Sequence, residues 1–186
     1  MSLLRCAAIA CGLLGLAACA SQIDEVSPSF ETLQILREQA VPPVAVGQFA
    51  PGSKNLGRSV TIRLSVMHAQ KGRDFAAFLG NAFETDLRAA GKLDPASALR
   101  IEGILTESHL AEDLGKGRAS LGATITLRRN GAVVFAKPYR VESSWPSDFI
   151  GAIAIPEAFR QYNALYSMLV KQTLSDPEFV KAAKGK

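Results

Sequence analysis

The sequence predicts an α+β domain in which a mainly antiparallel sheet of about five strands packs against two main helices on one face. Three observations predict it: segments in which apolar and polar residues alternate, two long segments with apolar residues every three or four positions, and turns that carry glycine or proline between them. Strands joined by short turns, with helices on one face, form a two-layer architecture. The 186 residues fit one such domain preceded by a processed leader.

The composition excludes several classes of protein. Apolar residues make up 48% of the chain and charged residues 20%, with a net charge of +4, which excludes a disordered chain. No apolar run reaches the 18 residues of a transmembrane helix. No basic stripe with interleaved aromatic residues is present, so we expect no nucleic-acid partner. The three cysteines are too few for a disulfide framework or a four-cysteine metal site.

The first 18 residues are typical of a signal peptide. Arg5 supplies a positive charge, and the thirteen residues from Cys6 to Ala18 contain no polar side chain. This length suits the hydrophobic region of a signal peptide and is too short to cross a bilayer. The residues 16–19, Leu-Ala-Ala-Cys, resemble the lipobox of bacterial lipoproteins. That resemblance implies that residues 1–18 are removed and that the thiol of Cys19 receives a lipid, with palmitate among its acyl chains.

The same resemblance implies a location for the mature protein. Ala20 and Ser21 follow the cysteine, and by similarity to enterobacterial sorting signals they imply transfer to the outer membrane rather than retention at the inner membrane. We therefore expect a protein that is anchored by its N-terminal lipid in the cell outer membrane and faces the periplasm. The alternative is that Cys19 is an incidental apolar residue of an ordinary signal peptide or of a buried helix.

The mature chain is expected to divide into a tether and one domain. Residues 19–43 are expected to form the lipidated N-terminus and the tether, with a short helix in its second half. Pro42 and Pro43 end this helix, because a residue before proline is pushed out of the helical region. The single periplasmic domain is expected over 44–183, and residues 184–186 are a frayed tail.

Alternating patterns place the five strands at 44–49, 59–67, 99–106, 120–128 and 133–139. The second strand is predicted to bury Val60, Ile62, Leu64 and Val66 on one face.

The last two strands form a hairpin whose loop length decides its register. A two-residue Asn-Gly turn would leave large apolar side chains on the polar face, so we expect a three-residue loop over 129–131 that pairs Leu127 with Val133.

Two long helices are expected. The first covers 74–90 and ends at Gly91, which suits a left-handed cap residue. Three phenylalanines on its apolar stripe are interpreted as core contacts with the sheet rather than as a ligand cleft. The second long helix is expected to begin at Pro156, because proline is favoured at the first helical position. A short final helix opens at 175–178.

The sequence contains no phosphate-binding loop, no His-Glu-x-x-His, no Gly-x-Ser-x-Gly elbow and no paired-cysteine signature. We therefore expect no catalytic residue, no metal and no cofactor. One cluster is the exception, because His109 lies near Glu107, Glu112 and Asp113 and could serve acid–base chemistry. The competing interpretation of this cluster is a solvated strand end followed by a polar turn.

The segment 143–156 is unusually apolar for a connection between a strand and a helix. It is either a lid folded over the core or a surface that contacts a partner. If it is a surface, the candidate residues for a partner or ligand are Trp145, Phe149, Ile150, Ile153 and Ile155.

The lipobox, the tether and one compact α+β domain over residues 19–183 resemble the auxiliary outer-membrane lipoprotein of ABC-type lipid-transport systems. This resemblance implies a non-enzymatic accessory role in envelope transport, assembly or maintenance, with an envelope protein partner or a lipid ligand. Two alternatives stay open: a periplasmic hydrolase or ligand-modifying enzyme that uses His109 with its neighbouring acids, and a purely structural lipoprotein.

Overall fold

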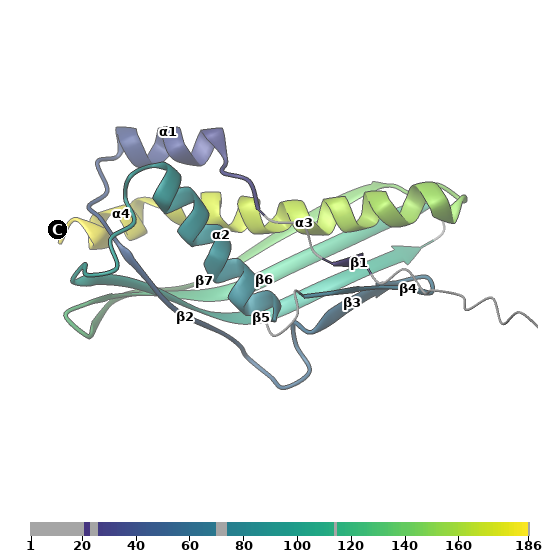
Figure 1. Cartoon of the computed structure of the whole chain (residues 1–186), viewed down its shortest axis with the longest axis horizontal. Helices are drawn as coiled ribbons and strands as arrows, with labels where there is room; N and C mark the ends of the chain where they lie inside the picture. The colour runs from purple at the N-terminus through teal and green to yellow at the C-terminus, as the bar shows by residue number, and fades with distance from the viewer. Residues whose placement is uncertain (1–20, 23–25, 70–73, 114, 186) are drawn as a thin grey trace, which may run out of the picture.

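The computed structural model describes residues 21–22, 26–69, 74–113 and 115–185, so the predicted lipid site, Cys19, lies outside the described residues. The main sheet has four strands in the order β2-β5-β6-β7 (Figure 1). Their bounds are Ala45–Pro51, Leu99–Asp113, Lys116–Arg129 and Ala132–Pro146. A small sheet of order β1-β4-β3 lies beside one end of β5 and consists of Ser21–Gln22, Ser65–His68 and Ser59–Ile62.

Helices cover one face of the main sheet, which confirms the α+β class (Figure 1). Helix α2 (Phe75–Ala89) packs against β2 and β5, and helix α3 (Gly151–Ser175) lies lengthwise along β6 and β7. The rings of Phe78 and Tyr166 meet edge to face at 4.7 Å between these two helices. Helix α1 (Phe30–Glu38) lies on α2 and α3, and α4 (Pro177–Ala183) closes the end of the sheet near the C-terminus.

The sheet differs from the prediction in strand number and in direction. It has four strands rather than about five, and its edge strand β2 runs parallel to β5, whereas β5, β6 and β7 form an antiparallel meander. The chain returns from β2 to β5 through the small sheet and α2, and a crossover of this kind allows the two strands to run in parallel.

The predicted strand over 59–67 is wrong, because the chain turns back in its middle. Strands β3 and β4 form a short antiparallel hairpin in which Ile62 pairs with Ser65. Arg63 occupies the turn with a φ of +52°, and Leu64 is fully exposed. The alternating pattern continues across this turn, so the pattern alone did not reveal it.

The predicted three-residue loop between β6 and β7 is also wrong. Asn130 and Gly131 form a two-residue turn with φ values of +49° and +84°, and Arg129 pairs with Ala132. A bulge one step farther on shifts the register so that Leu127 pairs with Phe135 instead of Val133. The bulge turns Phe135 toward the helices, where its ring meets that of Phe179 at 5.6 Å.

The predicted helix over 74–90 is confirmed as α2. Asp74 caps it by accepting a hydrogen bond from the Ala77 amide at 2.8 Å, and Gly91 follows it with a φ of +67°. All three phenylalanines of its stripe are buried in the core, as predicted.

The second long helix begins earlier than predicted. α3 starts at Gly151, so Pro156 lies inside the helix rather than at its first position. Proline at this point removes only the hydrogen bond to the carbonyl of the exposed residue Ala152. One stripe of this helix is buried and consists of Phe159, Tyr162, Leu165, Tyr166, Leu169 and Val170.

The second half of the predicted tether packs onto the domain. Leu36 of α1 and Val41 after it are fully buried in the core. The buried carboxylate of Asp86 in α2 accepts a hydrogen bond from the Ser29 amide at 2.9 Å, which holds the start of α1. Burial raises the pKa of Asp86, and the hydrogen bond from Ser29 partly opposes this.

Trp145 near the end of β7 lies across a glycine on the neighbouring strand. Gly117 pairs directly with Trp145, and a Cβ atom at Gly117 would lie only 2.3–2.6 Å from atoms of the indole. The indole therefore occupies the space that any larger residue at position 117 would need.

We expect Gly117→Ala to lower the free energy of unfolding by about 1–3 kcal/mol, because the indole must leave its site on the sheet. The control is Gly47→Ala on β2, where a new Cβ atom meets only flexible atoms of Arg100 and Glu102 at 2.9–3.0 Å. Denaturant unfolding measures both variants. Equal losses for the two would contradict this account of Trp145.

We expect Asp86→Asn to stabilise the protein at neutral pH relative to wild type, because the amide keeps an acceptor for Ser29 without a buried charge. An acid with a raised pKa contributes stability below its unfolded pKa and loses it as the pH rises through the folded pKa. The advantage of the variant should therefore shrink as the pH falls toward 4. Thermal unfolding from pH 4 to 7 measures it, and a difference that does not change with pH would refute the assignment.

Candidate functional site

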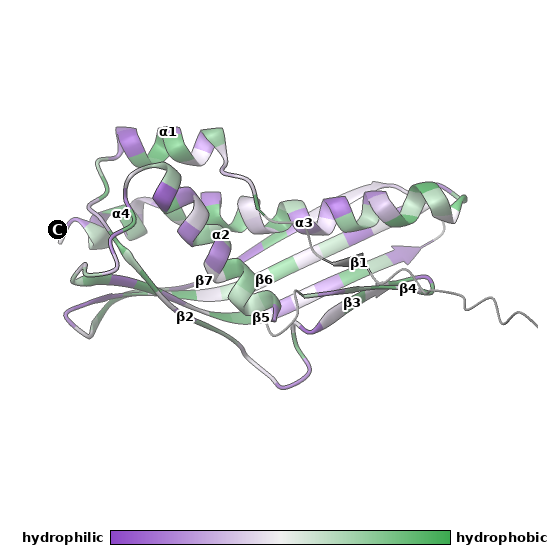
Figure 2. Cartoon of the chain, in the orientation of Figure 1, coloured by the Kyte–Doolittle hydropathy of each residue, from purple (hydrophilic) through white to green (hydrophobic). Residues whose placement is uncertain are grey.

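One end of the molecule presents four large apolar side chains to solvent, and we call them the apolar tip. They are Leu64 at 100% exposure, Phe149 at 85%, Ile150 at 60% and Ile153 at 54%. Leu64 comes from the β3–β4 turn, and the other three come from the β7–α3 loop and the first turn of α3. Figure 2 shows the hydrophobic colouring at this N-terminal end of α3. Exposed apolar patches of this kind mark contact surfaces.

A single arginine joins the two segments of the apolar tip. The guanidinium of Arg63 donates hydrogen bonds to the carbonyl oxygens of Asp148 at 2.6 Å and Phe149 at 3.1 Å. It also donates two hydrogen bonds to the carboxylate of Glu112 on β5, at 2.5 and 2.8 Å. Such bidentate pairing fixes both position and orientation. Arg63 thereby ties the β3–β4 turn, the end of β5 and the β7–α3 loop together.

Glu112 holds Arg63 and the start of the β7–α3 loop in place. Its carboxylate also accepts a hydrogen bond from the Ser147 hydroxyl at 2.6 Å, at the start of the β7–α3 loop. The hydrogen bonds from Arg63 and then from Ser147 lower the pKa of Glu112. Only 11% of the Glu112 side chain is exposed, so the pair is better shielded from solvent than an ordinary surface ion pair.

The five residues predicted as a partner or ligand surface separate into two groups. Phe149, Ile150 and Ile153 are exposed and belong to the apolar tip. Trp145 is buried in the core, and Ile155 is half-buried and packs against it, so neither belongs to the exposed surface. The segment 143–156 is thus not one loop, because β7 continues to Pro146 and α3 begins at Gly151.

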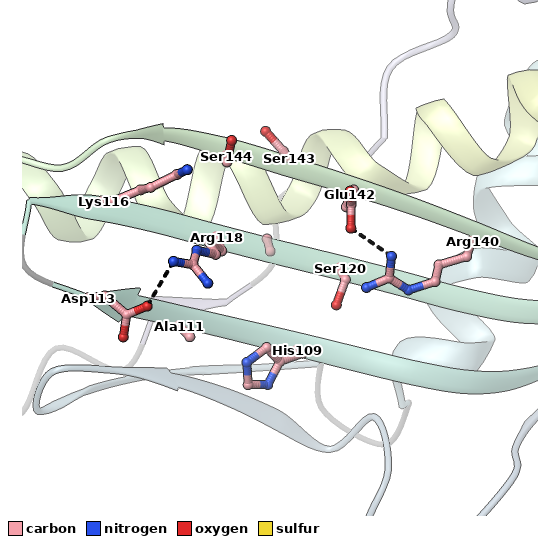
Figure 3. A pocket seen from close by; sticks show the side chains of 11 residues that line it. His109, Ala111, Asp113, Lys116, Arg118, Ser120, Arg140, Glu142, Ser143 and Ser144 are labelled. Atoms are coloured by element: carbon pink, nitrogen blue, oxygen red, sulfur yellow. Dashed lines mark hydrogen bonds and ion pairs between the residues drawn. The ribbon is translucent and has the colours of Figure 1, made fainter.

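A polar groove of about 690 Å³ lies on the face of the sheet opposite to the helices, toward the same end of the molecule. The residues that line it belong to β5, β6 and β7 (Figure 3). Its charged groups are largely paired with one another. Arg118 pairs with Asp113 at 3.2 Å, and Arg140 pairs with Glu142 at 2.6 Å.

His109 lies on this face near Glu107, but the acids around it are paired with arginines. Glu107 is on the same face but accepts hydrogen bonds from Arg140 at 2.8 and 3.1 Å and from Ser120, which together lower its pKa. Asp113 is paired with Arg118, and Figure 3 shows His109 apart from that pair. Among the described residues, the exposed His109 makes no hydrogen bond to either carboxylate. Glu107 lies close enough to His109 for their charges to interact, but each acid of the predicted cluster is paired with an arginine: Glu107 with Arg140, Asp113 with Arg118 and Glu112 with Arg63.

Two further observations concern the parts of the chain that the structure describes. No group of three or more His, Cys, Asp or Glu residues there is arranged to hold a metal ion. No helix in the same ranges is long and apolar enough to span a membrane.

Sequence reasoning missed two residues that shape the apolar tip. The alternating pattern predicts a buried position for Leu64, which is fully exposed, and no sequence pattern singles out Arg63. No local signal marks the exposure of Leu64, because the alternation of apolar and polar residues continues through the turn. Arg63 and Glu112 are 49 positions apart, so no local pattern connects them.

The comparisons with known proteins show the fold. No family model matches the sequence, and no curated protein matches it. Protein XCC0632 from Xanthomonas campestris, a DUF330 protein, matches with a TM-score of 0.53 and 14% identity, over 83% of this chain and 94% of that one. This chain therefore shares its fold.

Two weaker matches have lower TM-scores. PelC from Paraburkholderia phytofirmans, solved as a dodecamer, gives a TM-score of 0.46 at 17% identity over 72% of this chain and 85% of that one. A minor lipoprotein from Acinetobacter baumannii gives 0.45 at 10% identity over 78% and 92%.

We expect Arg63→Ala to speed amide hydrogen exchange several-fold at residues 147–151, because the β7–α3 loop loses the hydrogen bonds that Asp148 and Phe149 accept. Arg140→Ala is the matched control, since it removes an arginine with two ion pairs from the other face of the sheet. Exchange measured by mass spectrometry should change at the loop only in the first variant. Unchanged exchange there would show that Arg63 does not hold the loop.

Proposed function

We propose that this chain is a lipid-anchored lipoprotein of the bacterial cell envelope and that it acts by binding rather than by catalysis. The single observation that carries the anchor is the lipobox over 16–19, which follows a charged start and an uninterrupted apolar run. The mature protein is held by acyl chains on Cys19 in the outer membrane, and its domain faces the periplasm. Two or more acyl chains give stable anchoring, whereas one gives only marginal binding.

The site geometry favours a binding role. The residues that acid–base catalysis would use are committed elsewhere, because Glu107 is bound by Arg140 and Asp113 by Arg118. The apolar tip, by contrast, consists of side chains with no role inside the fold. We therefore assign the protein an accessory role in envelope transport, assembly or maintenance, with contact to a protein partner or a lipid through the apolar tip.

A hydrolytic or ligand-modifying role remains the second candidate function. The observation in its favour is the groove, which places His109 beside paired acids and bases on an accessible face. An activity of the purified protein that His109→Ala abolishes would favour this alternative over the binding role.

We expect Cys19→Ser to release the protein from the membrane fraction into the soluble periplasmic fraction, because the variant has no thiol to accept the lipid. Cys11→Ser is the control, since that cysteine lies in the segment that processing removes. Cell fractionation followed by immunoblotting measures both. If the Cys19 variant stays with membranes after a high-salt wash, the anchoring proposal is wrong.

A further inference from the structure

The apolar tip is held in place although it is exposed. Its loop is fixed by the Arg63 hydrogen bonds to Asp148 and Phe149, and the Ser147 amide donates to the Gly115 carbonyl at 2.8 Å. The Ile150 amide donates to the Asp148 carboxylate at 2.8 Å at the start of α3. An exposed apolar surface that is held in one conformation is suited to bind an apolar partner outside the chain.

The start of the described chain lies at the same end of the molecule. β1 runs parallel to β4, with Ser21 opposite Met67 and Gln22 opposite His68. β4 begins at Ser65, directly after the Arg63–Leu64 turn, so the direction of β1 places Ser21 toward that turn and Gln22 away from it. Two peptide steps join Cys19 to Ser21, which limits their Cα separation to about 7 Å. The lipid of the proposed function therefore attaches at the same end of the molecule as the apolar tip.

The charges at this end do not select for an anionic or a cationic partner. Three basic and three acidic residues come from the turns and strand ends around the apolar tip: Arg63, Lys116, Arg118, Glu112, Asp113 and Asp148. A balanced set supplies no net attraction to a charged surface. The apolar side chains are thus the groups that would drive binding.

We propose that the apolar tip inserts into the acyl region of the lipid bilayer that holds the N-terminal lipid. This proposal rests on the proposed function, because the lipid on Cys19 supplies the attachment beside which the apolar tip lies. Phe149, Ile150 and Ile153 on one segment and Leu64 on the other form a second contact with the membrane. Two contacts restrict the orientation of the domain, whereas attachment through the lipid alone is a single point about which the domain could turn.

A bilayer fits these observations better than a protein partner does. Distance is the first reason. The acylated residue is two peptide steps from the start of β1, so the membrane that holds the lipid lies at the same end of the molecule as the apolar tip. The second reason is the chemistry of the apolar tip. It consists of aliphatic side chains and one phenylalanine at the start of a helix and in a neighbouring turn, and the charged residues around it balance.

The test uses single cysteines that carry an environment-sensitive fluorophore in the full-length, acylated protein. Acylation of Cys19 leaves an introduced cysteine as the only free thiol of the mature chain. The labelled positions are Phe149→Cys and Ile153→Cys at the apolar tip, with Val133→Cys as the control. Val133 is 53% exposed, close to the 54% of Ile153, but lies beside the β6–β7 turn at the opposite end of the sheet.

On reconstitution into phosphatidylcholine vesicles, we expect a blue shift and a several-fold rise in fluorescence at positions 149 and 153, with none at 133. Lipids that carry bromine on the acyl chains should quench the first two labels, and added phosphatidylglycerol or 0.5 M salt should leave the result unchanged. Labels at 149 and 153 that stay as exposed to water as the label at 133 would overturn the proposal.

Two further outcomes separate this proposal from the proposed function. Incorporation of labelled palmitate into wild type but not into Cys19→Ser shows acylation, so acylated protein with a water-exposed tip refutes the insertion alone. No incorporation refutes the proposed function, and the insertion with it. A photoreactive side chain at position 149 that crosslinks in cells to one envelope protein instead of lipid would assign the apolar tip to that partner and overturn the insertion.

Discussion

The hydrogen bonds of one guanidinium decide the shape of the end of the molecule on which the functional account depends. Arg63 lies in a left-handed turn and contacts a carboxylate 49 positions away and two carbonyl oxygens more than 80 positions away. Residues from three separate parts of the chain thereby meet at one point. Without Arg63, the β3–β4 turn and the β7–α3 loop would lack the hydrogen bonds that connect them.

The hydrophobic core between α3 and the sheet supports the end of the molecule that carries the apolar tip. Helix α3 runs the length of the sheet, and its buried stripe meets β6 and β7 along most of its 25 residues. The first turn of α3 extends beyond that packed region and carries Ile153 into solvent. Trp145, which presses on Gly117, closes the core just before the loop begins. Within four positions the chain therefore passes from the buried Trp145 to the exposed Phe149.

Elements with local signals could be predicted from the sequence, and elements set by distant contacts could not. Helix α2 was predictable because Asp74, Gly91 and the apolar stripe between them all act within the same segment. The exposed position of Leu64 was not, because the turn beside it depends on a partner on β5. Phe149, Ile150 and Ile153 could be identified as an unusual apolar run, but the burial of Trp145 in that run required the pairing with Gly117.

The central claim is that acyl chains on Cys19 hold this domain in the envelope, and the intact mass of the membrane-extracted protein tests it most directly. The account predicts a mass greater than that of residues 19–186 by the mass of the attached acyl groups. A mass that equals the unmodified chain, with or without residues 1–18, would contradict the lipid anchor and every conclusion that rests on it.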